Sequence, residues 1–294
     1  MRLSRRRSIR RDLRKAIFRT IQVFNVLKNK TFKFPWKTTK KVSIGDIITS
    51  DQYAEINSKP ELQQGSTPLF GKPFHYSDGK GFLHSLKEIF ADEVYRFDTA
   101  SPAPFIIDAG ANMGLSVLYF KRLHPKSRII AFEPDPTIFA VLNRNVASCR
   151  LDQVDTREAA VWTEDGELRF YSEGSLAGSS EVDLRAQGQA TVVRAERLKP
   201  LLQNEKVDFL KIDIEGAENA VMFDIEDELD NVEHLFFEYH SVPGKDQMLG
   251  DLLNIASRKG FRYVINGPHG ARLPFIDRKK RTFDLQLNVS CFRL

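Results

Sequence analysis

The stretch FIIDAGANMGLSV, residues 105–117, decides how the rest of the chain is interpreted. Its apolar start predicts a buried strand, and the apolar pattern of residues 115–123 predicts a helix. Between the two, Gly110, Asn112 and Gly114 stand at every second position, so small residues form the turn from strand to helix. Such a turn lets a ligand come close to the backbone.

Outward from this stretch, strands and helices alternate along the chain. The other predicted strands are RIIAF (128–132), VDTREAAVW (154–162), VDFLKID (207–213), VEHLFFEYH (232–240), FRYVI (261–265) and DLQLNVSCF (284–292), with shorter β segments at GELRFYS (166–172) and ATVVRA (190–195). The last of the long segments alternates strictly between apolar and polar residues, which indicates an antiparallel partner. The order predicts an α/β layer structure with a mostly parallel sheet and an antiparallel C-terminal strand.

Capping residues predict where two of the helices begin. Asp135 is expected to cap a helix that starts at Pro136. Ser85 and Glu88 form a candidate capping box for a helix that ends near Phe97.

The composition is that of a globular protein with one main domain and appendages: 294 residues, 41% hydrophobic and 28% charged. Two cysteines, Cys149 and Cys291, are too few for a disulfide framework, and no Cys/His pair has a zinc-binding spacing. No apolar stretch reaches the roughly 18–20 residues of a membrane-spanning helix, and there is no secretory signal. We therefore expect a cytoplasmic protein that is not integral to a membrane.

Charge is distributed unevenly along the chain. Residues 1–45 carry 15 Lys or Arg and one acid, Asp12, which gives a net charge of +14. Because the whole chain carries +5, the other 249 residues carry −9. We divide the chain into a basic extension (1–45), a connecting or cap region interrupted by Pro and Gly (46–100), and a main domain (101–294).

The basic extension has the pattern of an amphipathic helix, with Leu13, Ile17, Ile21, Phe24 and Leu27 on one face. Three roles fit this pattern: docking on the main domain, peripheral contact of residues 1–30 with an anionic surface such as a membrane, and an organelle transit peptide. The sequence does not choose between them.

Acidic residues fall at or just after the ends of four predicted strands: Asp108, Glu133, Asp213 with Glu215, and Glu238. Ligands of parallel sheets bind beyond the carboxyl ends of the strands, near the point where the strand order reverses, so we expect these acids to converge on one crevice. Gathering carboxylates is costly without cations or hydrogen-bond donors, and a ligand would offset that cost.

The turn favours one class of cofactor. Glu133 lies 19 residues after Gly114, a spacing that suits a carboxylate accepting hydrogen bonds from ribose hydroxyls. A dinucleotide site would have the pattern Gly-x-Gly-x-x-Gly, whereas Gly110 and Gly114 give Gly-x-x-x-Gly after Asp108. An aspartate in the turn would repel a pyrophosphate and attract an ammonium group. The pattern therefore predicts S-adenosylmethionine rather than NAD.

The segment KIDIEG carries the candidate catalytic groups, because Lys211, Asp213 and Glu215 share one side of an extended chain. They can orient an acceptor hydroxyl and receive its proton, or the carboxylates can hold a divalent cation. His240 is a second candidate base, since a histidine with an ordinary pKa titrates near neutral pH.

Three segments in order, IIDAGANMGLSVLYF, IIAFEPDP and VDFLKIDIEGAENAVM, resemble the FkbM-type S-adenosylmethionine-dependent methyltransferases, and the resemblance extends from about residue 105 to residue 291. It implies a Rossmann-like, seven-stranded class I methyltransferase sheet within residues 101–294, and O-methylation of a small-molecule or carbohydrate hydroxyl, lipid-linked acceptors included. The predicted cofactor contacts are Asp108, Ala109, Gly110, Asn112, Met113, Gly114, Glu133, Pro134, Ala160 and Asp213. The predicted catalytic residues are Lys211, Asp213, Glu215 and His240, and no residue is assigned to a resident metal.

Other functions fit parts of the sequence. A nucleic-acid-binding protein or RNA methyltransferase would use the basic extension to follow phosphates, but the remainder of the chain is acidic. A NAD-binding oxidoreductase or a catalytically silent scaffold at a membrane would keep the same fold. We expect a small-molecule or glycan acceptor as the partner and no nucleic acid, and the oligomeric state does not follow from the sequence.

Overall fold

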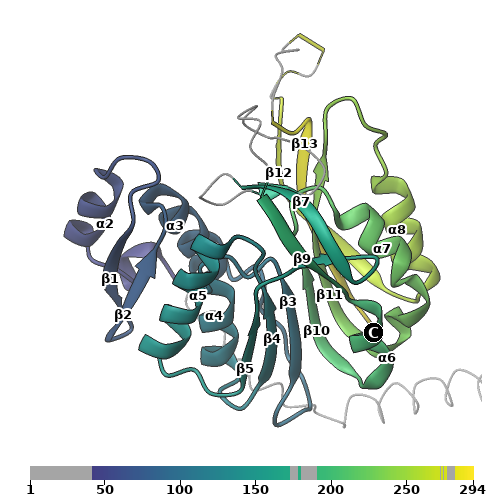
Figure 1. Ribbon diagram of the computed structural model, residues 1–294, viewed down its shortest axis with the longest axis horizontal. Helices are drawn as coiled ribbons and strands as arrows, with labels where there is room; N and C mark the ends of the chain where they lie inside the picture. Colours follow the sequence, from purple (N-terminus) through teal and green to yellow (C-terminus); the bar gives the residue numbers. More distant parts are fainter. Residues whose placement is uncertain (1–41, 173–177, 180–190, 272, 274, 277–281) are drawn as a thin grey trace, which may run out of the picture. The chain divides into compact units, whose positions relative to one another are not determined.

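The computed structural model describes residues 42–172, 178–179, 191–271, 273, 275–276 and 282–294 (Figure 1). The chain divides into two compact units, and all of the described residues belong to the second, Lys41–Leu294. The predicted helix and membrane contact of residues 1–30 therefore lie outside the described residues. Within the described part, no helix combines the length and the apolar character that crossing a bilayer requires.

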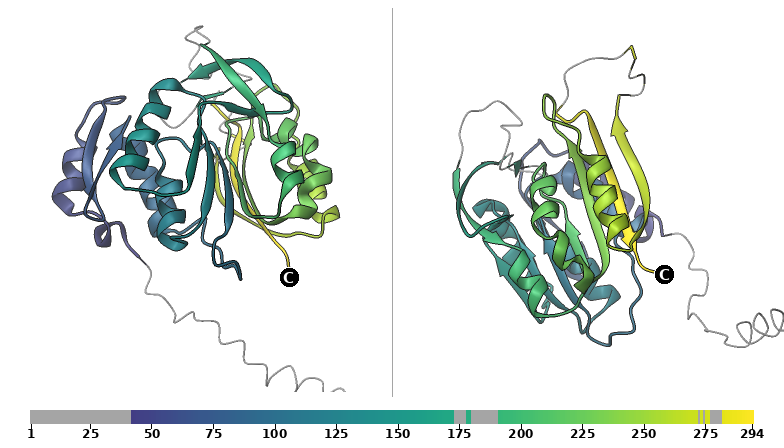
Figure 2. Two further views of the ribbon diagram at one scale, coloured as in Figure 1. Left: turned by 60° about the horizontal axis from the view of Figure 1, so that its bottom comes forward. Right: turned by 90° about the vertical axis from the view of Figure 1, so that its right-hand side faces the viewer.

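A seven-stranded sheet forms the centre of this unit, in the order β12-β13-β11-β10-β3-β4-β5 (Figure 1, Figure 2). β13 runs antiparallel to both of its neighbours, and the remaining neighbours in the sheet pair in parallel. The strands are β3 (Phe105–Ala109), β4 (Arg128–Phe132), β5 (Val154–Arg157), β10 (Val207–Ile212), β11 (Val232–Ser241), β12 (Arg262–Gly270) and β13 (Leu285–Phe292). This confirms the predicted α/β fold, a mostly parallel seven-stranded sheet with an antiparallel C-terminal strand.

The strand order reverses between β3 and β10. From β3 the chain moves outward through β4 and β5, and from β10 it moves in the opposite direction through β11. Asp108 lies next to Lys211 in this pair of central strands, and Ala109 lies next to Ile212. Because the connections leave the two strands on opposite sides, their carboxyl ends border an open crevice.

Helices cover both faces of the sheet, which explains why the central strands β3, β4 and β10 are apolar on both sides. α4 (Leu115–Leu123) and α5 (Pro136–Ser148) pack on one face, and α7 (Glu218–Asp224) and α8 (Leu249–Arg258) pack on the other (Figure 1). Phe209 and Leu210 are neighbours in β10 but belong to two separate clusters of buried residues, one on each face. The shorter α6 (Lys199–Asn204) and η3 (Glu226–Asn231) precede β10 and β11.

The start of α5 is confirmed as predicted. Asp135 is its N-cap, and the carboxylate accepts hydrogen bonds from the backbone N–H groups of Thr137 at 2.7 Å and Ile138 at 3.0 Å. The cap occupies a helix start whose N–H groups have no partner within the helix.

The described residues before β3 pack onto the α4 and α5 side of the sheet. They form η1 (Ile44–Asp46), α2 (Ser50–Asn57), the hairpin of β1 (Gly65–Leu69) and β2 (Lys72–Tyr76), and α3 (Gly79–Leu86), which continues as the π-helical turn η2 (Lys87–Ala91). Asn145 of α5 fastens the hairpin: its side chain accepts a hydrogen bond from His75 N at 2.7 Å and donates to the backbone oxygens of His75 and Met113, both at 2.8 Å.

The helix predicted to start at Ser85 begins earlier, so the predicted capping box of Ser85 and Glu88 is wrong. Asp78 is the N-cap, and its carboxylate accepts a hydrogen bond from Gly81 N at 2.6 Å. Because the helix already begins after Asp78, Ser85 lies in its interior and cannot be its N-cap. The helix also ends well before Phe97, after its π-helical turn.

The predicted strand 154–162 is two strands in two sheets. β5 is the edge of the central sheet, whereas β6 (Ala160–Trp162) pairs with β9 (Thr191–Arg197) in a small sheet of order β6-β9-β7-β8, completed by β7 (Gly166–Ser172) and β8 (Gly178–Ser179). Ala159 N donates a hydrogen bond to Arg157 O at 3.0 Å, a turn that separates the two strands. The apolar residues continue through this turn, so their pattern does not reveal the break.

Candidate active site

An open cavity, of about 1180 Å³ when the adjoining solvent space is included, lies at the carboxyl ends of the central strands, where β3 and β10 diverge. Its walls come from the turn after β3, the end of β4, the segment after β10, the helix formed by α3 and η2, and the small sheet. The predicted site residues that line it are Gly110, Asn112, Met113, Glu133, Pro134, Ala160, Lys211, Asp213 and Glu215. Asp108, Ala109, Gly114 and His240 are buried next to the cavity or in the turn but are not among its lining residues.

The turn after β3 packs against the end of β10 with no room for a side chain. Gly110 has a φ of +86°, and a Cβ built on it would lie 1.8 Å from the backbone oxygen of Asp213. Gly114 has a φ of +89°, and its Cβ would lie 2.7 Å from Cδ1 of Leu142. Both glycines are therefore required by backbone conformation and by close packing. Gly110 lets the ends of β3 and β10 come together at the wall of the cavity, and Gly114 lets the start of α4 pack against α5.

Glu133 holds the turn against the end of β4. One carboxylate oxygen accepts a hydrogen bond from Asn112 N at 3.0 Å, and the other accepts one from Asp135 N at 2.9 Å. The side chain borders the cavity although the residue is only 5% exposed. Burial raises the pKa of Glu133 to about 8, so further hydrogen-bond donors from a ligand would stabilise its ionised form.

Lys211 is a buried cation between two carboxylates. Its Nζ lies 3.3 Å from Asp108 Oδ1 and 3.2 Å from Asp213 Oδ2, and it donates a hydrogen bond to Gly110 O at 2.8 Å. Burial alone would lower the pKa of Lys211, but the charges of Asp213 and Asp108 outweigh it and raise the pKa above its ordinary range. Lys211 is therefore charged, and it ties β10 to the turn.

Asp108 lies one layer beneath the cavity. Its side chain is fully buried, and Oδ2 accepts a hydrogen bond from Ser116 Oγ at 2.5 Å. Lys211 lies beside the other oxygen, Oδ1, which is buried and has no hydrogen-bond partner among the described residues. The structure thus places this residue in support of the turn, whereas the sequence predicts a direct cofactor contact.

Glu215 does not share a face with Asp213 through strand alternation, because β10 ends at Ile212 and Glu215 has a φ of +54°. The bend turns Glu215 toward His240, whose Nε2 lies 3.2 Å from Glu215 Oε2. On the other side of the ring, Nδ1 lies 3.0 Å from Glu218 Oε1. His240 is thus enclosed by two carboxylates.

His240 is a buried histidine whose surroundings favour the protonated ring. Burial would lower its pKa, but Glu215 and Glu218 outweigh that effect and raise the pKa of His240 well above 6.5. The expectation of a base with an ordinary pKa is therefore wrong: at neutral pH the ring already carries its second proton. Glu218, which the sequence analysis did not single out, also accepts hydrogen bonds from the backbone N–H groups of Ile214 and Gly216 and so fixes the bend after β10.

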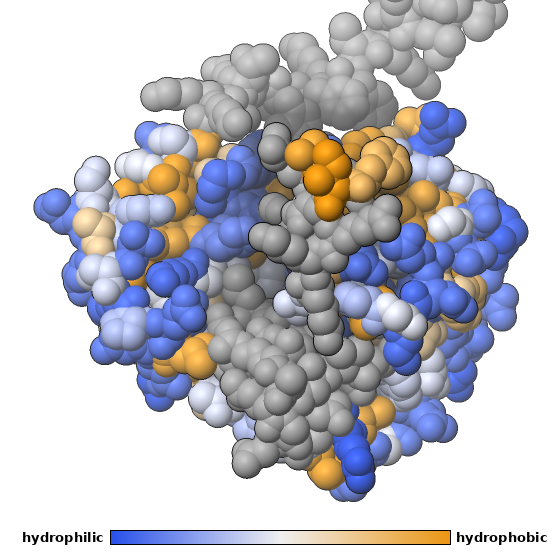
Figure 3. Space-filling view, turned by 90° about the horizontal axis from the view of Figure 1, so that it is seen from above, coloured by the Kyte–Doolittle hydropathy of each residue, from blue (hydrophilic) through white to orange (hydrophobic). Residues whose placement is uncertain are grey.

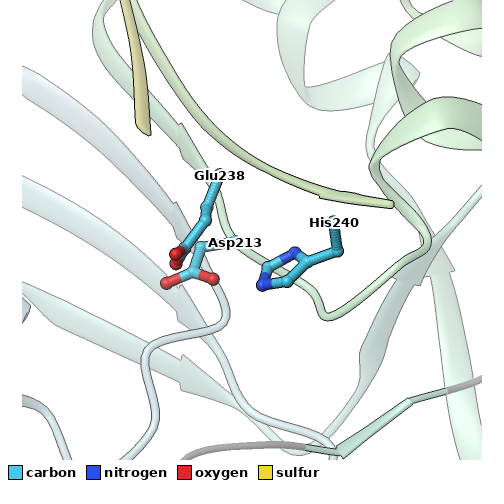
Figure 4. Close-up of side chains that lie close together, drawn as sticks. All are labelled: Asp213, Glu238 and His240. Carbon is cyan, nitrogen blue, oxygen red and sulfur yellow. The ribbon is translucent and has the colours of Figure 1, made fainter. Parts of the chain in front are cut away.

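Glu238 completes the site. Figure 4 shows its carboxylate pointing toward that of Asp213, with the His240 ring facing the pair. Burial, with the charge of Asp213, raises the pKa of Glu238 to about 9. Burial would also raise the pKa of Asp213, but Lys211 and His240 outweigh it and lower the pKa. At neutral pH, Asp213 is thus ionised and Glu238 is neutral.

The same three side chains are the candidate cation ligands among the described residues. One ligand atom each from Asp213, Glu238 and His240 lies within 4.8 Å of the other two. Both ring nitrogens of His240 are already engaged by Glu215 and Glu218. A cation would have to displace Glu215 and remove a proton from the ring, so the arrangement does not fit a resident divalent cation.

The helix of α3 and η2 forms a wall of the cavity that the sequence analysis did not assign to the site. His84, Ser85 and Glu88 line it, and Asn288 Nδ2 donates a hydrogen bond to Glu88 Oε1 at 3.0 Å. π-helical turns are frequent at functional sites. The sequence pattern around residues 79–91 predicts only a helix, and no feature of it indicates that one face borders a cavity.

Known proteins that resemble this chain include methyltransferases. Residues 108–263 match the family model described as Methyltransferase FkbM domain. The chain is similar to Methyltransferase sdnD of Sordaria araneosa, with 33% identity over 176 residues that cover 48% of this chain and 68% of that protein. It is similar to Methyltransferase 1 of Beauveria bassiana, with 30% identity over 214 residues that cover 65% of this chain and 84% of that protein. It is also similar to 31-O-demethyl-FK506 methyltransferase FkbM of Streptomyces tacrolimicus, with 27% identity over 228 residues that cover 65% of this chain and 85% of that protein.

Proposed function

The chain belongs to the FkbM family of methyltransferases, and from that premise we propose that it transfers the methyl group of S-adenosylmethionine to a hydroxyl oxygen of a small-molecule or carbohydrate acceptor. The name of one relative, 31-O-demethyl-FK506 methyltransferase, supports transfer to oxygen. The observation that carries the choice of cofactor is the charge of the cavity.

Carboxylates dominate the charged groups that line the cavity. Lys211 is the one Lys or Arg among its described lining residues, and it is already engaged by Asp108 and Asp213. A pyrophosphate would therefore find no free cation in the described lining, which argues against NAD. Glu133 suits the hydroxyls of a ribose, and the acidic end of the cavity suits a sulfonium and an ammonium group. We assign the cofactor contacts to the turn of residues 110–113 and to Glu133.

When bound, S-adenosylmethionine supplies an electrophilic methyl group on a sulfonium. Asp213 lines the cavity as an ionised carboxylate, and in our proposal it would receive the proton of the acceptor hydroxyl as the methyl group passes from sulfur to oxygen. Glu238 is neutral and donates a hydrogen bond to Asp213. Lys211 and His240 keep Asp213 ionised before the acceptor binds.

Among the described residues that line the cavity, no Lys or Arg is available to bind a phosphate, because Lys211 is paired with Asp108 and Asp213. An RNA methyltransferase or another nucleic-acid-binding function would therefore depend on the basic extension. Membrane contact of residues 1–30, the cytoplasmic location and the identity of the acceptor likewise remain predictions from the sequence. A divalent cation is not part of the proposal, because His240 is engaged on both sides.

Calorimetry with S-adenosylmethionine and NAD in parallel tests the choice of cofactor. We expect S-adenosylmethionine to bind and Glu133→Ala to weaken its binding by roughly 1–3 kcal/mol, because a buried carboxylate loses hydrogen bonds to the ligand. Glu164→Ala, which removes an exposed carboxylate, is the matched control and should bind as the wild type does. The assignment would be refuted if NAD bound in preference to S-adenosylmethionine. It would also be refuted if Glu133→Ala and Glu164→Ala bound S-adenosylmethionine equally tightly.

The acceptor can be sought with radiolabelled S-adenosylmethionine added to cell extracts, with and without their membranes. Label in a lipid-extractable product would indicate a lipid-linked hydroxyl, and label in the soluble fraction would indicate a free small molecule or glycan. Label that is recovered in nucleic acid would contradict the proposed acceptor class.

A further inference from the structure

Tyr95 is a buried tyrosine in the wall of the cavity, and it lies outside the residues that match the family model. It follows η2 in the connection to β3 and is only 6% exposed. Within the described part of the chain, its hydroxyl group has no hydrogen-bond partner. Buried polar groups are nearly always paired, so an unpaired hydroxyl at a cavity wall indicates a group that is directed toward a ligand.

Aromatic packing fixes the ring of Tyr95 beside the charged centre of the site. The ring centroid lies 4.8 Å from that of Phe236 in β11, edge to face, and 5.8 Å from that of Phe120 in α4. Nζ of Lys211, which is paired with Asp213, lies 5.7 Å from the ring centroid. A ring held in this way presents its hydroxyl group in one position.

The hydroxyl group keeps its proton at neutral pH. Burial raises the pKa of Tyr95 well above 10, and the negative charge of Asp213 raises it further. Tyr95 is therefore a hydrogen-bond donor and not a base. The effect of Asp213 on the hydroxyl also indicates that the group lies on the Asp213 side of the cavity.

We propose that the Tyr95 hydroxyl donates a hydrogen bond to the acceptor oxygen whose proton passes to Asp213, an inference that rests on the proposed function. A hydroxyl group has one proton and two lone pairs. With the proton directed to Asp213 and one lone pair directed to Tyr95, the other lone pair is left for the methyl group. The hydrogen bond also stabilises negative charge on the oxygen as its proton leaves. Tyr95 neither gains nor loses a proton in this step.

The surroundings of Tyr95 favour an acceptor without negative charge. Glu88 lies on the same wall and also raises the pKa of Tyr95, and its Oε1 accepts a hydrogen bond from Asn288 Nδ2 at 3.0 Å. A carboxylate or phosphate on the acceptor would be repelled by Glu88 and Asp213, whereas a hydroxyl group can pair with both the donor and the carboxylates. Seen from above, the described surface on this side of the molecule shows blue hydrophilic side chains next to orange apolar ones (Figure 3).

The melting temperature of Tyr95→Phe tests whether the hydroxyl serves the protein or a ligand. The substitution keeps the ring and removes a group without a described partner, so we expect no loss of stability. Tyr239→Phe is the contrast, because the Tyr239 hydroxyl accepts a hydrogen bond from Met248 N at 3.0 Å, and its melting temperature should fall by about 2–4 °C or more. An equally large fall for Tyr95→Phe would assign its hydroxyl to the protein interior and overturn the proposal.

Calorimetry and radiolabelling then test which ligand the hydroxyl binds. Tyr95→Phe should bind S-adenosylmethionine within about twofold of the wild type. With cell extract as the source of acceptor, it should need about tenfold more extract for half-maximal labelling, because one hydrogen bond to the acceptor is lost. Tyr119→Phe is the matched control: the Tyr119 hydroxyl is 3.4 Å from Glu93 Oε1, the residue is not among the described lining residues, and its labelling should saturate as in the wild type.

Two outcomes would overturn the role of Tyr95 while the proposed function stands. Weaker binding of S-adenosylmethionine by Tyr95→Phe would make the hydroxyl a cofactor contact, and saturation at the same amount of extract in all three proteins would show that it does not bind the acceptor. If the wild-type chain labels no product, the proposed function fails, and this inference fails with it.

Discussion

The substitution Glu238→Gln should stabilise the protein increasingly as the pH rises. Burial, with the nearby charge of Asp213, raises the pKa of Glu238 from its ordinary value of 4.5 to about 9. Between these values the folded protein keeps a proton that the unfolded chain has released, so the free energy of unfolding of the wild type falls with rising pH. Gln keeps the shape and the donor of the neutral carboxyl group but does not titrate. At about 1.4 kcal/mol per pH unit, a step from about pH 6 to about pH 8 should shift the difference between variant and wild type by roughly 2.7 kcal/mol in favour of Gln.

Denaturant unfolding of both proteins at the two pH values measures this shift. Glu233→Gln is the control: its hydrogen bond with Lys206 lowers the pKa of Glu233, which is therefore ionised in the folded and unfolded chain over this range. Its stability difference should not change with pH. If the difference for Glu238→Gln is also constant, Glu238 is ionised in the folded protein, and the assignment of a neutral donor next to Asp213 is refuted.

Three further substitutions test the packing and the chemistry around the site. Gly110→Ala should lower the free energy of unfolding by at least about 1–2 kcal/mol, because alanine is strained at this positive φ. It should also abolish cofactor binding, because the added methyl group displaces the end of β10. An unchanged melting temperature together with unchanged cofactor affinity in calorimetry would contradict the packing argument. Asp213→Asn should keep S-adenosylmethionine affinity within about threefold but lose turnover in a radiolabel assay, and wild-type rates would remove Asp213 from the mechanism. Asn145→Ala should cost roughly 2–4 kcal/mol in denaturant unfolding, because it leaves buried backbone groups of the hairpin and the turn without partners; a loss too small to measure would show that water replaces the side chain.

The sequence predicts the central strands β3, β4 and β10 well because they are buried on both faces. Such strands appear as apolar runs, and the glycine turn at residues 110–114 and the cap at Asp135 fix how two of them lead into helices. The errors fall where local pattern and tertiary packing diverge. An apolar run continues through Ala159 although the chain changes sheets there, and Ser85 resembles a cap although Asp78 already serves as one.

For the site, the sequence predicts which acids meet but not which of them face a ligand. Strand ends in a parallel sheet lie at one edge, so the convergence of Asp213 and Glu238 follows from topology. The role of His240 does not, because its pKa depends on Glu218, which reaches the ring from the start of α7. The cavity wall formed by α3 and η2 could not be predicted from the sequence pattern either, because a helix face that borders a cavity and one that borders the core carry similar residues.

Two buried side chains that carry positive charge, Lys211 and His240, determine which carboxylates of the site are ionised. Lys211 balances Asp108 and Asp213, and His240 balances Glu215. Among the described contacts, Glu133 and Glu238 form no ion pair, and they are the two strand-end acids whose pKa is raised, to about 8 and about 9. A raised pKa means that the protein leaves the charge of these two groups poorly compensated. Donors from a ligand would compensate Glu133, and a retained proton does so for Glu238. The two acids without an ion pair among the described contacts thus differ from Asp213, whose pKa Lys211 and His240 lower, and this comparison requires the positions of both cations.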